Sequence, residues 1–148
     1  MRRVRSKALT LTGIVTAAFI AGTTFGTAIA REPAKRFTPL LATSKTVMDE
    51  PIVYPSGTAK ITTGLLTLDP GDETGWHTHG VPLTGLVLEG DLTVDYGDKG
   101  TRTFHAGESI AEAINVPHNG RNLGTTAVKV FVAYAGADGV PTMTPFKP

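Results

Sequence analysis

Turn-forming residues interrupt this chain every few positions between residues 46 and 135, and this punctuation constrains the fold most. The stretch Lys60–Leu68, rich in Thr, Leu and Ile, stops at Asp69-Pro70-Gly71, and Asp91–Tyr96 stops at Gly97–Gly100. No part of this region sustains the 3.6-residue apolar period that an amphipathic helix requires. Short strands at intervals of about 8–12 residues are typical of an all-β sandwich or barrel. The sequence therefore predicts an all-β, antiparallel fold.

Alternation of apolar and polar residues supports this prediction. Leu92, Val94 and Tyr96 are separated by polar residues, and a similar alternation returns in the segment 127–134. Successive side chains on a strand point to opposite faces of a sheet, so the three apolar residues would share the face that packs on the core. A single small all-β domain, either a sandwich or a barrel, is the architecture that this pattern favours.

The N-terminal segment has the pattern of a secretory signal peptide. Residues 1–7 carry four basic side chains and no acidic one, residues 8–30 are uncharged, and the run ends Ala28-Ile29-Ala30. A basic start, an apolar middle and a small-residue end are typical of such peptides. We expect cleavage after Ala30 and export to the periplasm or the medium; an uncleaved segment would instead anchor the chain in a membrane. The expected parts are a signal peptide (1–30), a flexible arm (31–45), a β-barrel domain (46–136) and a C-terminal tail (137–148).

Loss of the signal peptide changes what the charge implies about partners. The whole chain has a net charge of +1, and removal of four basic residues and no acidic one leaves −3. The remaining basic residues are scattered rather than gathered in a stripe. The sequence therefore predicts no nucleic-acid partner and, after cleavage, no membrane partner.

Two of the four histidines stand two residues apart, in Gly75-Trp76-His77-Thr78-His79-Gly80. Side chains at i and i+2 share one face of a strand, so both imidazoles could reach one metal ion. Taken alone, so short a pattern is better explained by two unrelated histidines at a solvated strand end. The chain contains no cysteine, so disulfides are excluded and any metal site must use His, Asp or Glu.

Two blocks of the chain resemble the two motifs of the cupin superfamily. The first motif combines a glycine, a His-x-His pair and a closing glycine, and the second combines a glycine, a histidine and an asparagine. The matching residues are Gly71, His77, His79 and Gly90 in the first block and Gly107, His118 and Asn122 in the second. The resemblance implies a β-barrel that holds a divalent metal ion (Fe, Mn, Zn, Ni or Cu) on His77, His79 and His118.

One residue of the cupin pattern is missing. The motif glutamate would fall at position 83 or 84, where this chain has Leu83 and Thr84. Glu112 is the candidate replacement, because a carboxylate in the small and apolar sequence SIAEAIN is out of place on a strand that lines a barrel. If Glu112 faces the barrel, it either ligates the metal or acts as a catalytic residue that moves a proton. The alternative is a solvated side chain.

The resemblance implies two functions of different kinds. As an enzyme, the barrel would use open metal positions for dioxygenase, isomerase or decarboxylase-like chemistry on a small oxygenated molecule. As a binding module, it would hold a metal or a small ligand outside the cytoplasm without turnover, since fold does not fix function. Small cupins often pair through strand edges, because an open barrel leaves edges that need cover. The resemblance therefore also implies a homodimer, with residues 46–55 as a strand that two copies could exchange.

Overall fold

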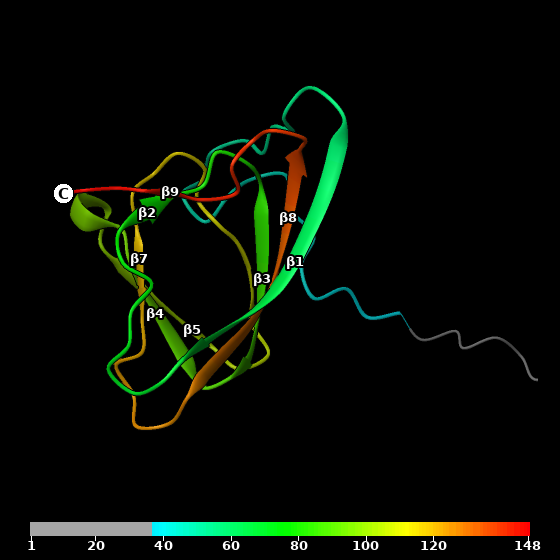
Figure 1. Cartoon of the computed structure of the whole chain (residues 1–148). Helices are drawn as coiled ribbons and strands as arrows, with labels where there is room; N and C mark the ends of the chain where they lie inside the picture. Colours follow the sequence, from blue (N-terminus) through cyan, green and yellow to red (C-terminus); the bar gives the residue numbers. More distant parts are fainter. Residues whose placement is uncertain (1–36) are drawn as a thin grey trace, which may run out of the picture. The chain divides into compact units, whose positions relative to one another are not determined.

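The computed structural model describes residues 37–148, which form one unit (Figure 1). The predicted signal peptide at 1–30 and the first part of the predicted arm, 31–36, lie outside the described residues. Within residues 37–148 the regular structure consists of β-strands and a single 3₁₀ turn, η1 (Gly97–Lys99), which confirms the all-β prediction. No helix in this part of the chain is long and apolar enough to cross a membrane.

The strands form two antiparallel sheets and a short two-stranded ribbon. They are β1 (Ala59–Leu68), β2 (His77–Thr78), β3 (Leu83–Glu89), β4 (Asp91–Asp95), β5 (Thr101–His105), β6 (Ser109–Ala111), β7 (Asn119–Arg121), β8 (Val128–Ala137) and β9 (Thr144–Pro145). One sheet has the order β1-β8-β3-β6, the second has the order β5-β4-β7, and β2 pairs with β9. Figure 1 shows the two larger sheets on opposite sides of the domain, as in an antiparallel β-barrel.

The core lies between the two larger sheets and follows the alternation in the sequence. Leu92 and Val94 on β4 and Tyr96 directly after it are buried, as the alternation predicts. On β8, Val128 and Val130 face the same interior. Burial of these side chains supplies the favourable free energy that holds the sheets together. The buried cluster consists of Leu68, Val87, Leu92, Val94, Tyr96, Ile110, Ala113, Val116, Val128 and Val130.

The turn residues Gly97–Gly100 form a hairpin connection, in which η1 joins β4 to β5 and the two strands pair antiparallel. The next two strands, β5 and β6, do not pair with each other: β5 pairs with β4, and β6 pairs with β3. The chain therefore passes from one sheet to the other at Ala106–Glu108. There the Gly107 amide donates a hydrogen bond to the Val87 carbonyl, with 2.8 Å between nitrogen and oxygen.

The segment that follows the predicted 46–136 domain and the first residues of that domain are both hydrogen-bonded to strands of the barrel. After β8 ends at Ala137, the chain turns back and β9 pairs with β2, the strand that carries His77. On the N-terminal side, the Val47 amide donates a hydrogen bond of 2.7 Å to the Ala111 carbonyl on β6. The segment predicted to be exchangeable between copies thus contacts its own barrel in this structure.

Candidate metal centre

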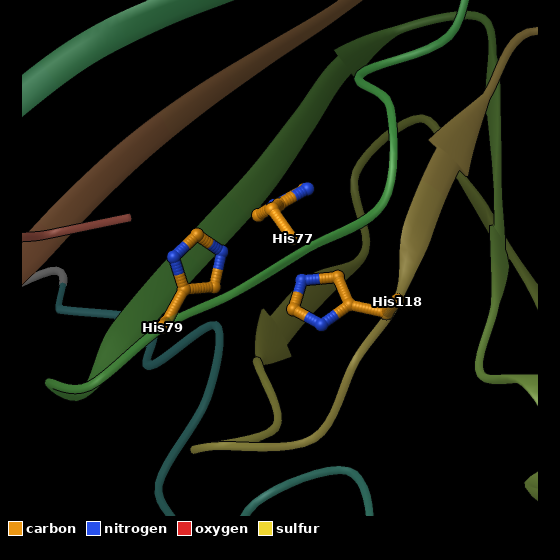
Figure 2. A group of neighbouring side chains, drawn as sticks. All are labelled: His77, His79 and His118. Atoms are coloured by element: carbon orange, nitrogen blue, oxygen red, sulfur yellow. The ribbon is translucent and has the colours of Figure 1, made fainter. Parts of the chain in front are cut away.

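The three motif histidines come together at one end of the barrel (Figure 2). His77 lies on β2, His79 follows in the loop before β3, and His118 directly precedes β7. Backbone hydrogen bonds join the two motifs, because the amide of His77 donates to the carbonyl of His118 and the reverse bond has the same length, 3.0 Å. This bridge places segments separated by about forty residues side by side and fixes where their side chains start.

Each imidazole is oriented by a backbone carbonyl at its Nδ1 atom. His77 Nδ1 lies 2.7 Å from the Gly75 oxygen, and His118 Nδ1 lies 2.8 Å from the Val116 oxygen. His79 Nδ1 lies 2.8 Å from the oxygen of Thr142. A carbonyl oxygen only accepts hydrogen bonds, so Nδ1 must carry the proton in all three rings and Nε2 keeps its lone pair. This is the orientation of histidines that bind a metal through Nε2.

The geometry of the cluster fits a metal site. One ligand atom from each ring lies within 4.8 Å of those of the other two, and ring centroids are 4.5 to 5.0 Å apart. The residues are almost fully buried, with 7%, 4% and 2% of the surface of His77, His79 and His118 exposed. Three converging imidazole lone pairs are a ligand set that first-row divalent metals accept.

Burial keeps two of these imidazoles neutral at physiological pH. Loss of solvation lowers the pKa of His79 from 6.5 to about 4, although the hydrogen bond to Thr142 opposes the change. Burial also lowers the pKa of His77, against the hydrogen bond to Gly75. The neighbouring imidazoles act in the same direction as burial, since a second positive charge so close would be repelled. Neutral rings are the form that binds metal, so the cluster is ready for a cation near neutral pH.

The histidines open into a cavity of about 290 Å³ inside the barrel. Leu83, at the position of the missing motif glutamate, lines this cavity together with apolar side chains from both sheets. Glu112 lies directly across the sheet, because its amide donates a 3.0 Å hydrogen bond to the Leu83 carbonyl. Glu112 is 7% exposed and also lines the cavity, so its carboxylate is buried in the barrel rather than solvated. The neighbouring strand therefore offers a carboxylate where the motif strand has lost one.

The Glu112 carboxylate is held in place by two donors on one oxygen. The Tyr96 hydroxyl donates to Oε1 at 2.8 Å, and the Ala113 amide donates to the same atom at 2.7 Å. Burial and the nearby carboxylate raise the pKa of Tyr96 well above its usual range, so its hydroxyl stays a donor. Glu112 is not part of the group of mutually close ligand atoms that the three histidines form. Direct ligation by Glu112 stays a prediction.

Several residues at the site escaped the sequence interpretation. Tyr134, Met143 and Glu73 also line the cavity. Alternation along β8 could have found Tyr134, because it shares the inward face with Val130 and its ring centroid lies 5.5 Å from that of His79. Glu73 stands four residues before His77, but sequence spacing gave no reason to select it. It accepts a 3.0 Å hydrogen bond from Asn119 Nδ2 at the edge of the cavity.

Two other motif or histidine positions have structural roles. His105 is exposed and hydrogen-bonds through Nδ1 to Asp91 at 2.8 Å, and that contact raises the pKa of His105. Asn122 is buried, and its amide donates to the carbonyls of Leu68 and Thr126 at 2.9 and 2.8 Å. Asn122 therefore fixes the loop after β7, while His105 lies outside the cluster that could bind a metal.

Comparison with known proteins identifies the domain. Residues 64–134 match the family model of the cupin domain, and this range contains the three histidines and Glu112. No curated protein matches the chain. The solved structures that are similar in fold include the three described next.

The polyketide cyclase RemF from Streptomyces resistomycificus is 20% identical with a TM-score of 0.52, over 60% of this chain and 61% of that chain. The DMSP lyase DddQ from Ruegeria pomeroyi is 16% identical with a TM-score of 0.52, over 60% and 44%. Oxalate decarboxylase from Lactobacillus farciminis is 16% identical with a TM-score of 0.50, over 58% and 26%. The match thus covers less than two thirds of each of these chains. At such low sequence identities the similarity shows a common fold and nothing about activity. The chain therefore contains a cupin domain at residues 64–134, and its three clustered histidines fit a cupin metal site.

Proposed function

We propose that this protein is an exported, metal-dependent enzyme that acts on a small oxygenated molecule. Export rests on the N-terminal sequence pattern, and metal binding rests on His77, His79 and His118. The observation that favours catalysis is Glu112, a buried carboxylate that lines the same cavity as the three imidazoles. Burial of a carboxylate costs free energy, and a role in proton transfer within this cavity is a function that would offset that cost.

The chain's own residues can bind, orient and exchange a proton with a substrate. A divalent cation on the three Nε2 atoms would supply Lewis acidity toward a carbonyl, enol or carboxylate oxygen. Glu112 is held at Oε1 by Tyr96 and Ala113, which leaves Oε2 to take or give a proton. Three neutral ligands leave the Glu112 carboxylate as a negative charge that lines the cavity with them, so the positive charge of a bound divalent cation would still attract an anionic substrate oxygen.

The cavity limits the class of substrate. Its volume of about 290 Å³ lies at the lower end of small-molecule sites, which span roughly 300–1,000 Å³. Its walls are mostly apolar apart from the histidines, Glu112, Glu73 and Thr74. A small enol, catechol or keto acid has the oxygen atoms and the apolar body that suit such walls. The similar structures are a cyclase, a lyase and a decarboxylase, so they do not indicate whether this protein would use dioxygenase, isomerase or decarboxylase chemistry.

The first test is metal content. The purified mature protein should contain about one equivalent of a divalent transition metal by elemental analysis, and His77→Ala should lose most of it because only two imidazoles remain. His105→Ala is the matched control and should retain the metal, since the His105 side chain is exposed, bonds to Asp91 and is not part of the histidine cluster. Absence of metal from the unsubstituted protein, after reconstitution with each of Fe, Mn, Zn, Ni and Cu, would refute the proposal.

The second measurement concerns Glu112. Glu112→Gln should keep the metal and the shape of the cavity but lower turnover by roughly 10²–10⁴-fold, because the amide cannot accept and return a proton. Oxygen uptake and product analysis over a panel of enols, catechols and keto acids provide the readout. Lost metal affinity in Glu112→Gln would assign the carboxylate as a ligand instead. A fully loaded protein that turns over none of these compounds would favour the non-catalytic binding module.

A further inference from the structure

The C-terminal strap, residues 141–146, contacts the candidate metal centre through Thr142 and Met143, although the cupin-domain match ends at residue 134. β9 pairs with β2, so that Thr144 faces Thr78 and Pro145 faces His77 in the register. The Phe146 amide donates a 2.9 Å hydrogen bond to the Trp76 carbonyl and fixes the far end of the strap. Figure 1 shows the end of the chain running beside β2.

The three histidines differ in where their orienting carbonyls come from. His77 and His118 each bond to the carbonyl two residues earlier in their own loop, Gly75 and Val116. His79 has no such local partner and bonds instead to Thr142, sixty-three residues further along the chain. Two of the three ligands are therefore oriented by their own motif, and the third depends on the strap.

We propose that the C-terminal strap is a positioning element of the metal centre, in which the Thr142 carbonyl holds His79 in its Nδ1-protonated form. Without that acceptor the His79 ring can rotate and exchange tautomers, and its Nε2 lone pair is no longer fixed toward the other two rings. The strap also supplies Met143, which lines the cavity. The expected effect of the strap on metal affinity rests on the proposed function, whereas the orientation of His79 can be measured without metal.

The contact is a main-chain carbonyl, so the test must move the backbone. Phe146→Pro removes the amide donated to Trp76, while Phe146→Ala removes the same side chain and keeps that amide. A chain ending at Val140 removes the strap, and a chain that lacks only Lys147 and Pro148 is its control. Met143→Ala alters the cavity wall and leaves the Thr142 carbonyl in place.

Nitrogen-15 NMR of the imidazoles in the metal-free protein at neutral pH reads the tautomer of each histidine. We expect a single Nδ1-protonated form for all three rings in the unsubstituted chain, Phe146→Ala, Met143→Ala and the short deletion. In Phe146→Pro and in the chain ending at Val140, His79 alone should show a mixture of tautomers, and metal affinity should fall about tenfold or more. His77 and His118 serve as internal controls.

The amide spectrum of β1 and β8 reports whether each variant keeps the barrel. If the chain ending at Val140 does not fold, Phe146→Pro against Phe146→Ala carries the test in the full-length chain. A folded variant without the strap contact that still shows one Nδ1-protonated form of His79 would overturn the proposal. Failure of the unsubstituted protein to bind metal would instead count against the proposed function, because the tautomer result does not depend on metal.

Discussion

At the candidate metal centre, burial and hydrogen bonds fix the tautomer of each imidazole and the position of the Glu112 carboxylate. The three imidazoles are removed from water, and each donates Nδ1–H to a carbonyl. The carboxylate of Glu112 is equally buried and accepts two hydrogen bonds at Oε1. The site thus combines neutral donors for a cation with one fixed carboxylate, and it achieves this without the motif glutamate that Leu83 replaces.

The burial of His79 predicts how the metal-free protein responds to acid. The pKa of His79 falls from 6.5 to about 4 on folding, so the unfolded chain binds more protons in between and the free energy of unfolding falls as the pH falls through this window. This group alone should cost about 2 kcal/mol between pH 7 and pH 5. Thermal unfolding of the metal-free protein at the two pH values measures the loss.

Two variants separate this effect from other titrations. His79→Gln should show a smaller loss of stability between pH 7 and pH 5, because the titrating ring is gone. His105→Gln should keep the loss, since that exposed ring titrates in the opposite sense: its pKa is raised by Asp91. An unchanged pH dependence in His79→Gln would contradict the assignment of the effect to His79.

At the level of elements, close approach of backbones decides where strands can turn. Gly90 joins β3 to β4 with a φ of +72°, and a Cβ atom there would lie 2.8 Å from the Ala127 carbonyl oxygen and 3.2 Å from the Val128 Cα. Backbone atoms cannot give way as a flexible side chain can. The closing glycine of the first motif is therefore required by the packing of this joint against β8.

Gly90→Ala should lower the free energy of unfolding by about 2–4 kcal/mol, because strain at positive φ adds to the backbone clash. Gly139→Ala is the matched control: its φ of +75° is nearly the same, but a Cβ atom there meets nothing within 4 Å. That substitution should cost only about 1 kcal/mol, from the backbone strain alone. Chemical denaturation of both variants gives the comparison, and equal losses would show that the contact with Ala127 does not matter.

For the molecule as a whole, the outer face of the sheet that carries β1 suggests how two copies could meet. β1 is an edge strand of the sheet. Ile61 and Leu65 on it and Phe131 beside them on β8 are 70%, 61% and 42% exposed, and Leu65 pairs with Phe131 in the register. A free strand edge next to an apolar face is a surface that a second copy can cover in an antiparallel pair.

We therefore expect the purified protein to elute as a dimer in sizing chromatography with light scattering. Leu65→Lys should shift it to a monomer, because the charge would be buried against the second copy. Leu123→Lys is the control, since Leu123 is also 65% exposed but lies in the loop between β7 and β8. A monomeric unsubstituted protein, or a dimer that persists in Leu65→Lys, would exclude this interface.

Much of the fold and part of the site could be predicted from the sequence, because both depend on local spacing. The alternation at Leu92, Val94 and Tyr96 identified the core face, and turn residues located the hairpin at Gly97–Gly100. The two-residue spacing placed His77 and His79 together, and the motif resemblance added His118. Even the carbonyls that orient His77 and His118 belong to residues only two positions earlier in the same loop.

The contacts that complete the site were decided only by tertiary structure. Strand register set Glu112 opposite Leu83, and no spacing along the chain encodes which strands become neighbours. The path of the last residues brought the Thr142 carbonyl to His79 and Met143 into the cavity wall. By itself, the sequence determined which side chains could bind a cation, because residue type and local period are written in it. Long-range packing decided which groups orient and enclose those side chains, because it brings together residues as far apart in the chain as His79 and Thr142, which are separated by sixty-three positions.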